Sequence, residues 1–174
     1  MKRVRDLVAQ VNALQREVNQ LPGIQKPVIM QKRLLPDLEQ IVTDPELYKL
    51  VEKLFENGHH ADAVKKAFVF LNNLVKAKAG KGKADGADLM RTSFSPNNPS
   101  LLLNAMNTQS ERDEQQGYMD IMAGVMTGIR NPRAHEHNWE DTEERALQLL
   151  SLANHLVLRI RSSKKLSEKD AGDG

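Results

Sequence analysis

The chain has 174 residues, with 25 Lys and Arg against 23 Asp and Glu, and it contains no cysteine. This length supports one domain with a sizeable core, and a net charge of +2 does not by itself indicate a nucleic-acid-binding protein. The lack of cysteine excludes disulfides and thiolate metal sites. No apolar signal core and no apolar run of about 18 residues occurs, so we expect a cytoplasmic protein without a membrane span.

Residues 1–21 carry apolar side chains at alternating steps of three and four. These positions are Val4, Leu7, Val11, Leu14, Val18 and Leu21. Valine at each a position and leucine at each d position of a heptad favour a parallel two-stranded coiled coil. The pattern therefore predicts a homodimer, with an amphipathic arm packed on its own domain as the alternative.

Pro22 and Gly23 end this element and begin a connector over residues 22–43, which contains three prolines. Within the connector we expect a short helix near residues 37–42. Asp44 followed by Pro45 then marks a helix start, because aspartate is a good N-cap and proline fits the first helical position.

Residues 44–161 are predicted to form an all-α, antiparallel four-helix bundle, because four segments carry apolar residues at helical spacing. The first helix should end at Asn57-Gly58, and the second should run from His59 or His60 to Ala79 before Gly80 closes it.

The third helix is expected to start at Ser110, with Asp113 completing a capping box, and the fourth to start at Asp141. Residues 80–110 form a long connection, part of which should pack back on the bundle. Residues 162–174 are polar and charged and are predicted to be a disordered tail.

The second helix and the loop after it are rich in lysine. Between residues 59 and 83 there are six lysines and one aspartate, Asp62. One interpretation is a positively charged surface that binds a phosphate backbone, in which Lys65 and Lys66 bind RNA. The alternative is a solvated helix face and a loose loop.

The strongest functional signal is Arg130-Asn131-Pro132-Arg133-Ala134-His135. Asn-Pro disfavours continuation of a helix, so we expect a break that brings Arg130, Asn131 and His135 to one anion. Histidine can take the proton from a ribose 2′-hydroxyl, and arginine can stabilise the phosphate. Asparagine would support the imidazole or the substrate, and Arg133 is a further candidate for RNA binding. This chemistry needs neither a metal nor a cofactor; the structural alternative is that basic residues favour a helix C-terminus.

This segment resembles the R-N-x-x-x-H form of the HEPN superfamily motif. The surrounding residues are similar to the Ymh-like, abortive-infection-associated branch of that superfamily over residues 44–161. The shared pattern consists of Phe55-x-x-Gly58, Ala61-x-Ala63-Val64, Gly86-x-x-Leu89-Met90, Gly117-Tyr118-Met119 and Gly128 to Glu136.

The resemblance implies a helical homodimer in which two motifs face each other across a cleft. It further implies a metal-independent endoribonuclease of toxin, phage-defence or RNA-processing systems, which leaves a 2′,3′-cyclic phosphate and can have an antitoxin or companion protein. Arg130 and His135 would be catalytic and Asn131 supporting. Some members of the superfamily are inactive and act as nucleotide-binding or interaction modules.

Two other hypotheses compete with the nuclease. A metal site could use His135 and His137 with His59 and His60, but two histidines two residues apart on a helix point to nearly opposite sides. A non-catalytic dimer could instead use the basic helix to bind RNA or could bind a partner protein.

Overall fold

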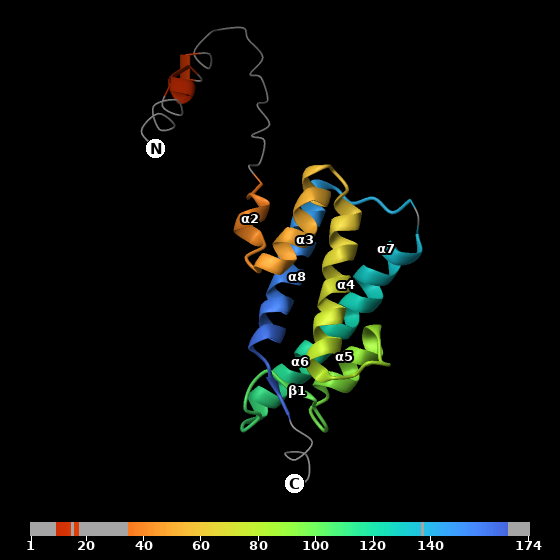
Figure 1. Ribbon diagram of the computed structural model, residues 1–174. Helices are drawn as coiled ribbons and strands as arrows, with labels where there is room; N and C mark the ends of the chain where they lie inside the picture. Colours follow the sequence, from red (N-terminus) through yellow and green to blue (C-terminus); the bar gives the residue numbers. More distant parts are fainter. Residues whose placement is uncertain (1–9, 15, 18–34, 137, 167–174) are drawn as a thin grey trace. The chain divides into compact units, whose positions relative to one another are not determined.

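The computed structural model describes residues 10–14, 16–17, 35–136 and 138–166 (Figure 1). The chain divides into two compact units, residues 1–34 and 35–174. In the first unit the described residues are helical, and Val11 and Leu14 are 52% and 61% exposed. The other heptad positions lie outside the described residues, so pairing through this helix stays a prediction.

The second unit is all-α, as the sequence predicts. Its four long helices are α3 (Pro45–Glu56), α4 (His60–Ala79), α6 (Gln109–Val125) and α8 (Glu143–Ser162). The shorter elements are α2 (Leu38–Ile41), α5 (Gly86–Phe94), the π-helix η1 (Met126–Arg130), α7 (Asn131–His135) and the strands β1 (Leu101–Leu102) and β2 (Lys164–Lys165). Among the described residues, no helix has both the length and the apolar character needed to cross a bilayer.

The long helices alternate in direction along the chain, but α4 and α8 pack side by side and run parallel (Figure 1). Lys78, near the C-terminal end of α4, donates to the carbonyls of Ile160 and Arg161 at the same end of α8, both at 2.7 Å. Glu114 near the start of α6 pairs with Arg159 near the end of α8 at 2.8 Å, so these two helices are antiparallel.

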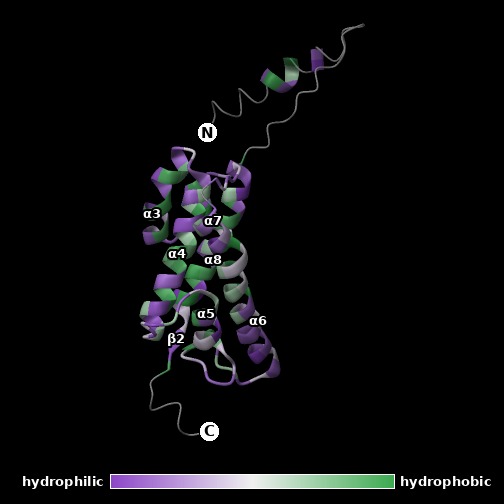
Figure 2. Ribbon diagram, turned by 90° about the vertical axis from the view of Figure 1, so that its right-hand side faces the viewer, coloured by the Kyte–Doolittle hydropathy of each residue, from purple (hydrophilic) through white to green (hydrophobic). Residues whose placement is uncertain are grey.

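The core is centred on α4 and α8, whose inward faces are almost completely buried. Phe68, Leu71 and Val75 of α4 and Leu156 and Ile160 of α8 have no exposed surface. Figure 2 shows hydrophobic residues concentrated on these two helices, while the first turns of α6 are hydrophilic. Burying this apolar area is the main stabilising contribution to the bundle.

The predicted ends of α3 and α4 are confirmed by their capping geometry. The Asp44 carboxylate accepts from the Leu47 N–H at 2.9 Å and caps α3. Gly58 and Gly80 have φ of 77° and 73°, a left-handed conformation in which glycine carries no steric penalty.

The predicted start of α6 was wrong by two residues. Thr108 is the N-cap, and its hydroxyl accepts from the Glu111 N–H while the Glu111 carboxylate accepts from the Thr108 N–H. The Glu111 side chain is longer than that of Asp113 and therefore reaches the N–H of its N-cap residue more easily. Ser110 consequently lies inside the first turn of α6. The N-cap of α8 is Thr142 rather than Asp141, because Asp141 is used by another contact described below.

The tail prediction was also wrong for residues 162–166. Lys164 and Lys165 form β2, which pairs antiparallel with β1, and the Leu166 N–H donates to the Ser100 carbonyl at 3.1 Å. Backbone pairing with the connection after α5 holds this stretch in place. Residues 167–174 lie outside the described residues.

The connection between α4 and α6 packs back on the bundle, as expected, and the buried Gln115 side chain fastens it. Its amide donates to the carbonyls of Phe94 and Leu101 at 3.0 and 2.9 Å and accepts from the Leu103 N–H at 3.0 Å. One side chain of α6 therefore satisfies three backbone groups that have no partner in a helix or strand ladder.

Replacement of Gln115 by leucine should lower the free energy of unfolding by about 3 kcal/mol, because it leaves these buried groups without a partner. Urea unfolding followed by circular dichroism measures the change. Gln116→Leu is the matched control, since Gln116 is exposed and its side-chain amide donates to Asp120 of its own helix. Equal stabilities of the two variants would contradict the anchoring role of Gln115.

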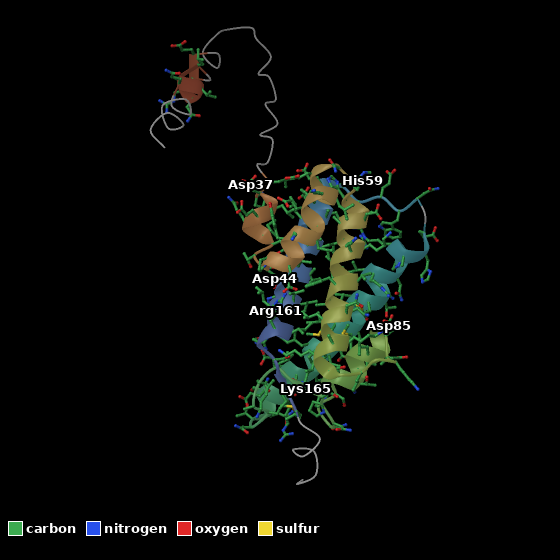
Figure 3. The ribbon with its side chains drawn as sticks, viewed as in Figure 1. Asp37, Asp44, His59, Asp85, Arg161 and Lys165 are labelled. Carbon is green, nitrogen blue, oxygen red and sulfur yellow. The ribbon has the colours of Figure 1, made fainter. Side chains whose placement is uncertain are left out.

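A second anchor fixes the start of α3 to the end of α8 (Figure 3). The Asp44 side chain is 1% exposed and accepts from the Arg161 guanidinium, and Asn154 accepts from the N–H groups of Thr43 and Asp44. Burial raises the pKa of Asp44, but hydrogen bonds from Arg161 and from the Leu47 N–H outweigh it and hold the pKa below the ordinary 3.8.

The stability contributed by Asp44 should therefore be present above pH 3.8 and lost as the pH falls through the lower pKa of the folded state. The unfolded chain binds the proton more readily in that window. Asp44→Asn should flatten the pH dependence of the free energy of unfolding there, as measured by urea titrations across the window. Asp88→Asn, at a side chain 91% exposed, is the control and should keep the wild-type slope.

Candidate functional site

The helix carrying the Arg130–His135 motif does not break at Pro132. Arg130 and Asn131 both have right-handed helical φ and ψ, and η1 continues directly into α7, which ends at His135. The expected break is therefore wrong. The Asn131 N–H donates to the Met126 carbonyl five residues earlier, and this wider turn accommodates a proline that would crowd a regular helix.

The end of η1 places the Arg130 guanidinium between two acceptors. Its Nη2 lies 3.3 Å from Asp85 Oδ2, and its Nη1 lies 3.2 Å from Asn131 Oδ1. The Arg130 side chain is 24% exposed, and its Nε is buried without a hydrogen-bond partner. The Arg130 guanidinium is thus held by two acceptors, and the side chain remains partly exposed.

Asp85 is itself fixed by α4. The buried Asn72 donates to Asp85 Oδ1 at 2.8 Å and accepts from the Gly86 N–H at 2.9 Å, and Lys76 Nζ lies 3.1 Å from the same carboxylate oxygen. The hydrogen bond from Asn72 is the largest influence lowering the pKa of Asp85, with Lys76 and Arg130 adding to it against the effect of burial. Asp85 is therefore an anion at neutral pH.

Arg133 is buried, which argues against its predicted role as an RNA-binding residue. Its side chain is 1% exposed and pairs through Nε and Nη2 with Asp141, at 2.6 and 2.7 Å, and the Asp141 side chain is 0% exposed. It also donates to the Ile129 carbonyl at 2.8 Å and lies over the Trp139 ring. Arg133 is occupied entirely in joining α7 to the segment that leads into α8.

His135 is exposed at the last residue of α7. Arg130 lies five positions earlier, and five residues of helix rotate by about 140°. Helix geometry therefore directs the two side chains to different sides of the helix, so we do not expect Arg130, Asn131 and His135 to meet around one anion within a single chain. Asn131 lies beside Arg130, and Asn131 and His135, four residues apart, share a face.

The lysine-rich stretch is largely engaged in structural contacts. Lys76 pairs with Asp85, Lys78 binds the end of α8, and Lys81 donates to the Thr92 carbonyl. Burial lowers the pKa values of Lys78 and Lys81, with the charge of Arg161 adding to the effect at Lys78. Lys65 is half-exposed and pairs with Asp62 at 2.8 Å.

Lys66 is exposed on α4. Lys65 is paired with Asp62, and three other lysines are engaged elsewhere. Fewer lysines of residues 59–83 are therefore available to bind phosphate than the composition suggests. RNA binding by Lys65 and Lys66 stays a prediction.

No group of three or more histidine and acidic side chains suited to a metal ion occurs in the part of the chain that the structure describes. The His60 ring packs at a tilt against the Phe55 ring, with ring centroids 4.9 Å apart. His137, part of the metal hypothesis, lies outside the described residues.

The sequence interpretation missed Asp85 and Asn72. Asp85 is recognisable as a residue before a helix, but its contact with Arg130 spans 45 positions of the chain. No local sequence pattern predicts such a contact, because the contact depends on how α4, α5 and η1 pack together.

Comparison with known proteins places this bundle in a family. Residues 42–160 match the family described as Protein of unknown function (Hypoth_ymh), and the chain belongs to it. The match begins at Val42, just after α2, and ends at Ile160, two residues before the end of α8. Neither the curated proteins nor the solved structures provide a significant match.

Proposed function

We propose that the protein is a metal-independent endoribonuclease with Arg130 and His135 as catalytic residues and Asn131 in support. The observation that carries the proposal is the oriented, partly exposed Arg130 guanidinium, on the same helix end as an exposed histidine. The resemblance of the R-N-x-x-x-H segment to the HEPN motif adds the reaction class.

In this mechanism His135 takes the proton from a ribose 2′-hydroxyl, and the oxygen then attacks the adjacent phosphorus. The bond to the 5′-oxygen breaks, which leaves a 2′,3′-cyclic phosphate on one fragment and a 5′-hydroxyl on the other. Arg130 donates to the phosphate oxygens as negative charge grows on them. The leaving 5′-oxygen takes a proton from solvent water, and the protonated His135 returns its proton to solvent after the reaction.

The active unit in this proposal is a homodimer. Because Arg130 and His135 diverge along one helix by about 140°, the two groups meet only if the arginine of one copy faces the histidine of the other across a two-fold axis. The heptad pattern of residues 1–21 independently favours dimers.

The biological setting we propose is a toxin or phage-defence system in the cytoplasm, with an antitoxin or companion protein as a possible partner. Expression of the wild-type chain should then slow growth, and Arg130→Ala should relieve the effect. Equal toxicity of the two chains would count against this setting.

The decisive experiment incubates the purified full-length protein with total RNA in excess EDTA and maps the cut ends. The proposal expects cleavage and cyclic-phosphate ends, while a His135→Ala preparation made in parallel controls for contaminating nuclease. If well-folded wild-type dimer binds RNA but never cuts it, the protein is a non-catalytic binding module of the kind that the same superfamily contains.

A further inference from the structure

The carboxylate of Asp85 lies where three helices meet. It starts α5, it is bonded to Asn72 and Lys76 of α4, and it pairs with Arg130 at the end of η1. Figure 3 shows Asp85 in the region where α4, α5 and the helix carrying the motif come together. Asn72 is 2% exposed, so this arrangement is anchored in the core rather than on the surface.

The net positive charge of Lys76, Asp85 and Arg130 together favours binding of an anion. Two cations, Lys76 and Arg130, share one carboxylate, and the balance is +1. The Arg130 guanidinium has donors on both Nη atoms, and Asp85 and Asn131 each accept from only one of them. The guanidinium is therefore held at two points while further donors can meet a phosphate.

We infer that Asp85 is a positioning residue for the proposed reaction, which fixes the Arg130 guanidinium through the chain Asn72–Asp85–Arg130 so that it meets the scissile phosphate in one orientation. This inference rests on the proposed function. A long arginine side chain loses conformational freedom when it binds, and a donor that is already fixed avoids that cost at the moment of reaction.

A merely structural role for Asp85 predicts different behaviour. Although Asp85 is the N-cap residue of α5, its side chain accepts no capping hydrogen bond, so its removal does not uncap the helix. The Asp85 side chain is also 49% exposed, so its ion pairs contribute little to stability.

The first test measures the mobility of the Arg130 guanidinium by nitrogen NMR relaxation of the full-length protein, with the signal assigned through Arg130→Lys. Wild type should show the order parameter of a rigid group, and Asp85→Ala should lower it below about 0.6. Asp85→Asn keeps an acceptor oxygen and should give an intermediate value. Asp88→Ala, on the same helix at a side chain 91% exposed, is the control and should change nothing.

The second test measures RNA cleavage by the same variants. Asp85→Ala should lower kcat by about 10²-fold, the cost of a misplaced catalytic group, with little change in KM. Asp85→Asn should recover part of the loss. Unchanged mobility of Arg130, or a kcat equal to or above wild type in Asp85→Ala, overturns the inference.

The two proposals fail in different ways. If wild type cuts no RNA, the proposed function fails, and the NMR comparison still decides whether Asp85 fixes Arg130. If wild type cuts RNA and Asp85→Ala cuts it equally well, the function stands and Asp85 has no positioning role. If Asp85→Ala does not fold, Asp85→Asn against wild type decides by the same readouts.

Discussion

Replacement of His135 by alanine is expected to lower the rate of RNA cleavage by about 10²- to 10⁴-fold, the usual contribution of a general base. The fold should survive, because His135 is exposed and lies at the last residue of α7. Single-turnover cleavage of a defined RNA measures the rate, and thermal unfolding and light scattering check the fold and the dimer.

His59→Ala is the matched control for this variant. His59 precedes α4, and its side chain makes no capping hydrogen bond, so this variant should cleave RNA at the wild-type rate. A His135→Ala protein as active as His59→Ala would remove His135 from the mechanism.

Mixing two inactive variants tests whether the site is shared between copies. Dimers that combine an Arg130→Ala chain with a His135→Ala chain contain one site with both groups intact if each site takes its arginine and histidine from different chains. Cleavage should then reappear on mixing. Continued inactivity of verified mixed dimers would show that both groups act from one chain.

Replacement of Arg133 by alanine is expected to lower the free energy of unfolding by about 3–5 kcal/mol, the usual cost of removing one member of a buried ion pair. Asp141 would lose both of its short hydrogen bonds at a side chain that is 0% exposed. The Ile129 carbonyl would lose a donor as well, and the Trp139 ring would lose its covering cation. Urea unfolding at neutral pH measures the change.

Arg145→Ala is the control for this pair. Arg145 also approaches Asp141, at 3.4 Å, and also lies near the Trp139 ring, but its side chain is 57% exposed. Its removal should cost no more than about 1 kcal/mol. Equal losses in the two variants would show that burial does not set the strength of these contacts.

The double variant Arg133→Met with Asp141→Leu separates charge from packing. Replacing both members of a buried pair by apolar groups is often neutral or stabilising, so this protein should be more stable than Arg133→Ala. A double variant as unstable as Arg133→Ala would locate the loss in packing around Trp139 rather than in the unpaired charge.

The parts of the fold that follow from local chemistry were predictable from the sequence. Asp44-Pro45 and the glycines at 58 and 80 set the ends of α3 and α4, because capping depends on neighbours within a few residues. The start of α6 was equally local. The sequence contains two pairs at capping-box spacing, Thr108 with Glu111 and Ser110 with Asp113, and the structure uses the first.

The site was less predictable because its contacts join distant segments. The position of Arg130 and the exposure of His135 follow from the motif, but the partner of Arg130 comes from 45 residues away. The burial of Arg133 depends on its ion pair with Asp141. From the sequence, Asp141 was predicted to be the start of the last helix, with no indication of this pairing. Asn131-Pro132 predicted a helix break because the steric crowding caused by a proline involves only nearby residues. The wider turn of η1 that relieves this crowding depends on packing against α4 and α5, which the local sequence does not reveal.

This wide turn makes the orientation of the motif depend on chain length as well as on residue type. A helix that loses or gains one residue rotates everything after it by about 100°. Shortening η1 by one residue would leave every side chain of the motif present and still aim Arg130 away from Asp85. Other proteins can carry the same six-residue motif. In each of them, the number of residues between the start of α6 and the arginine determines which side chain that arginine contacts.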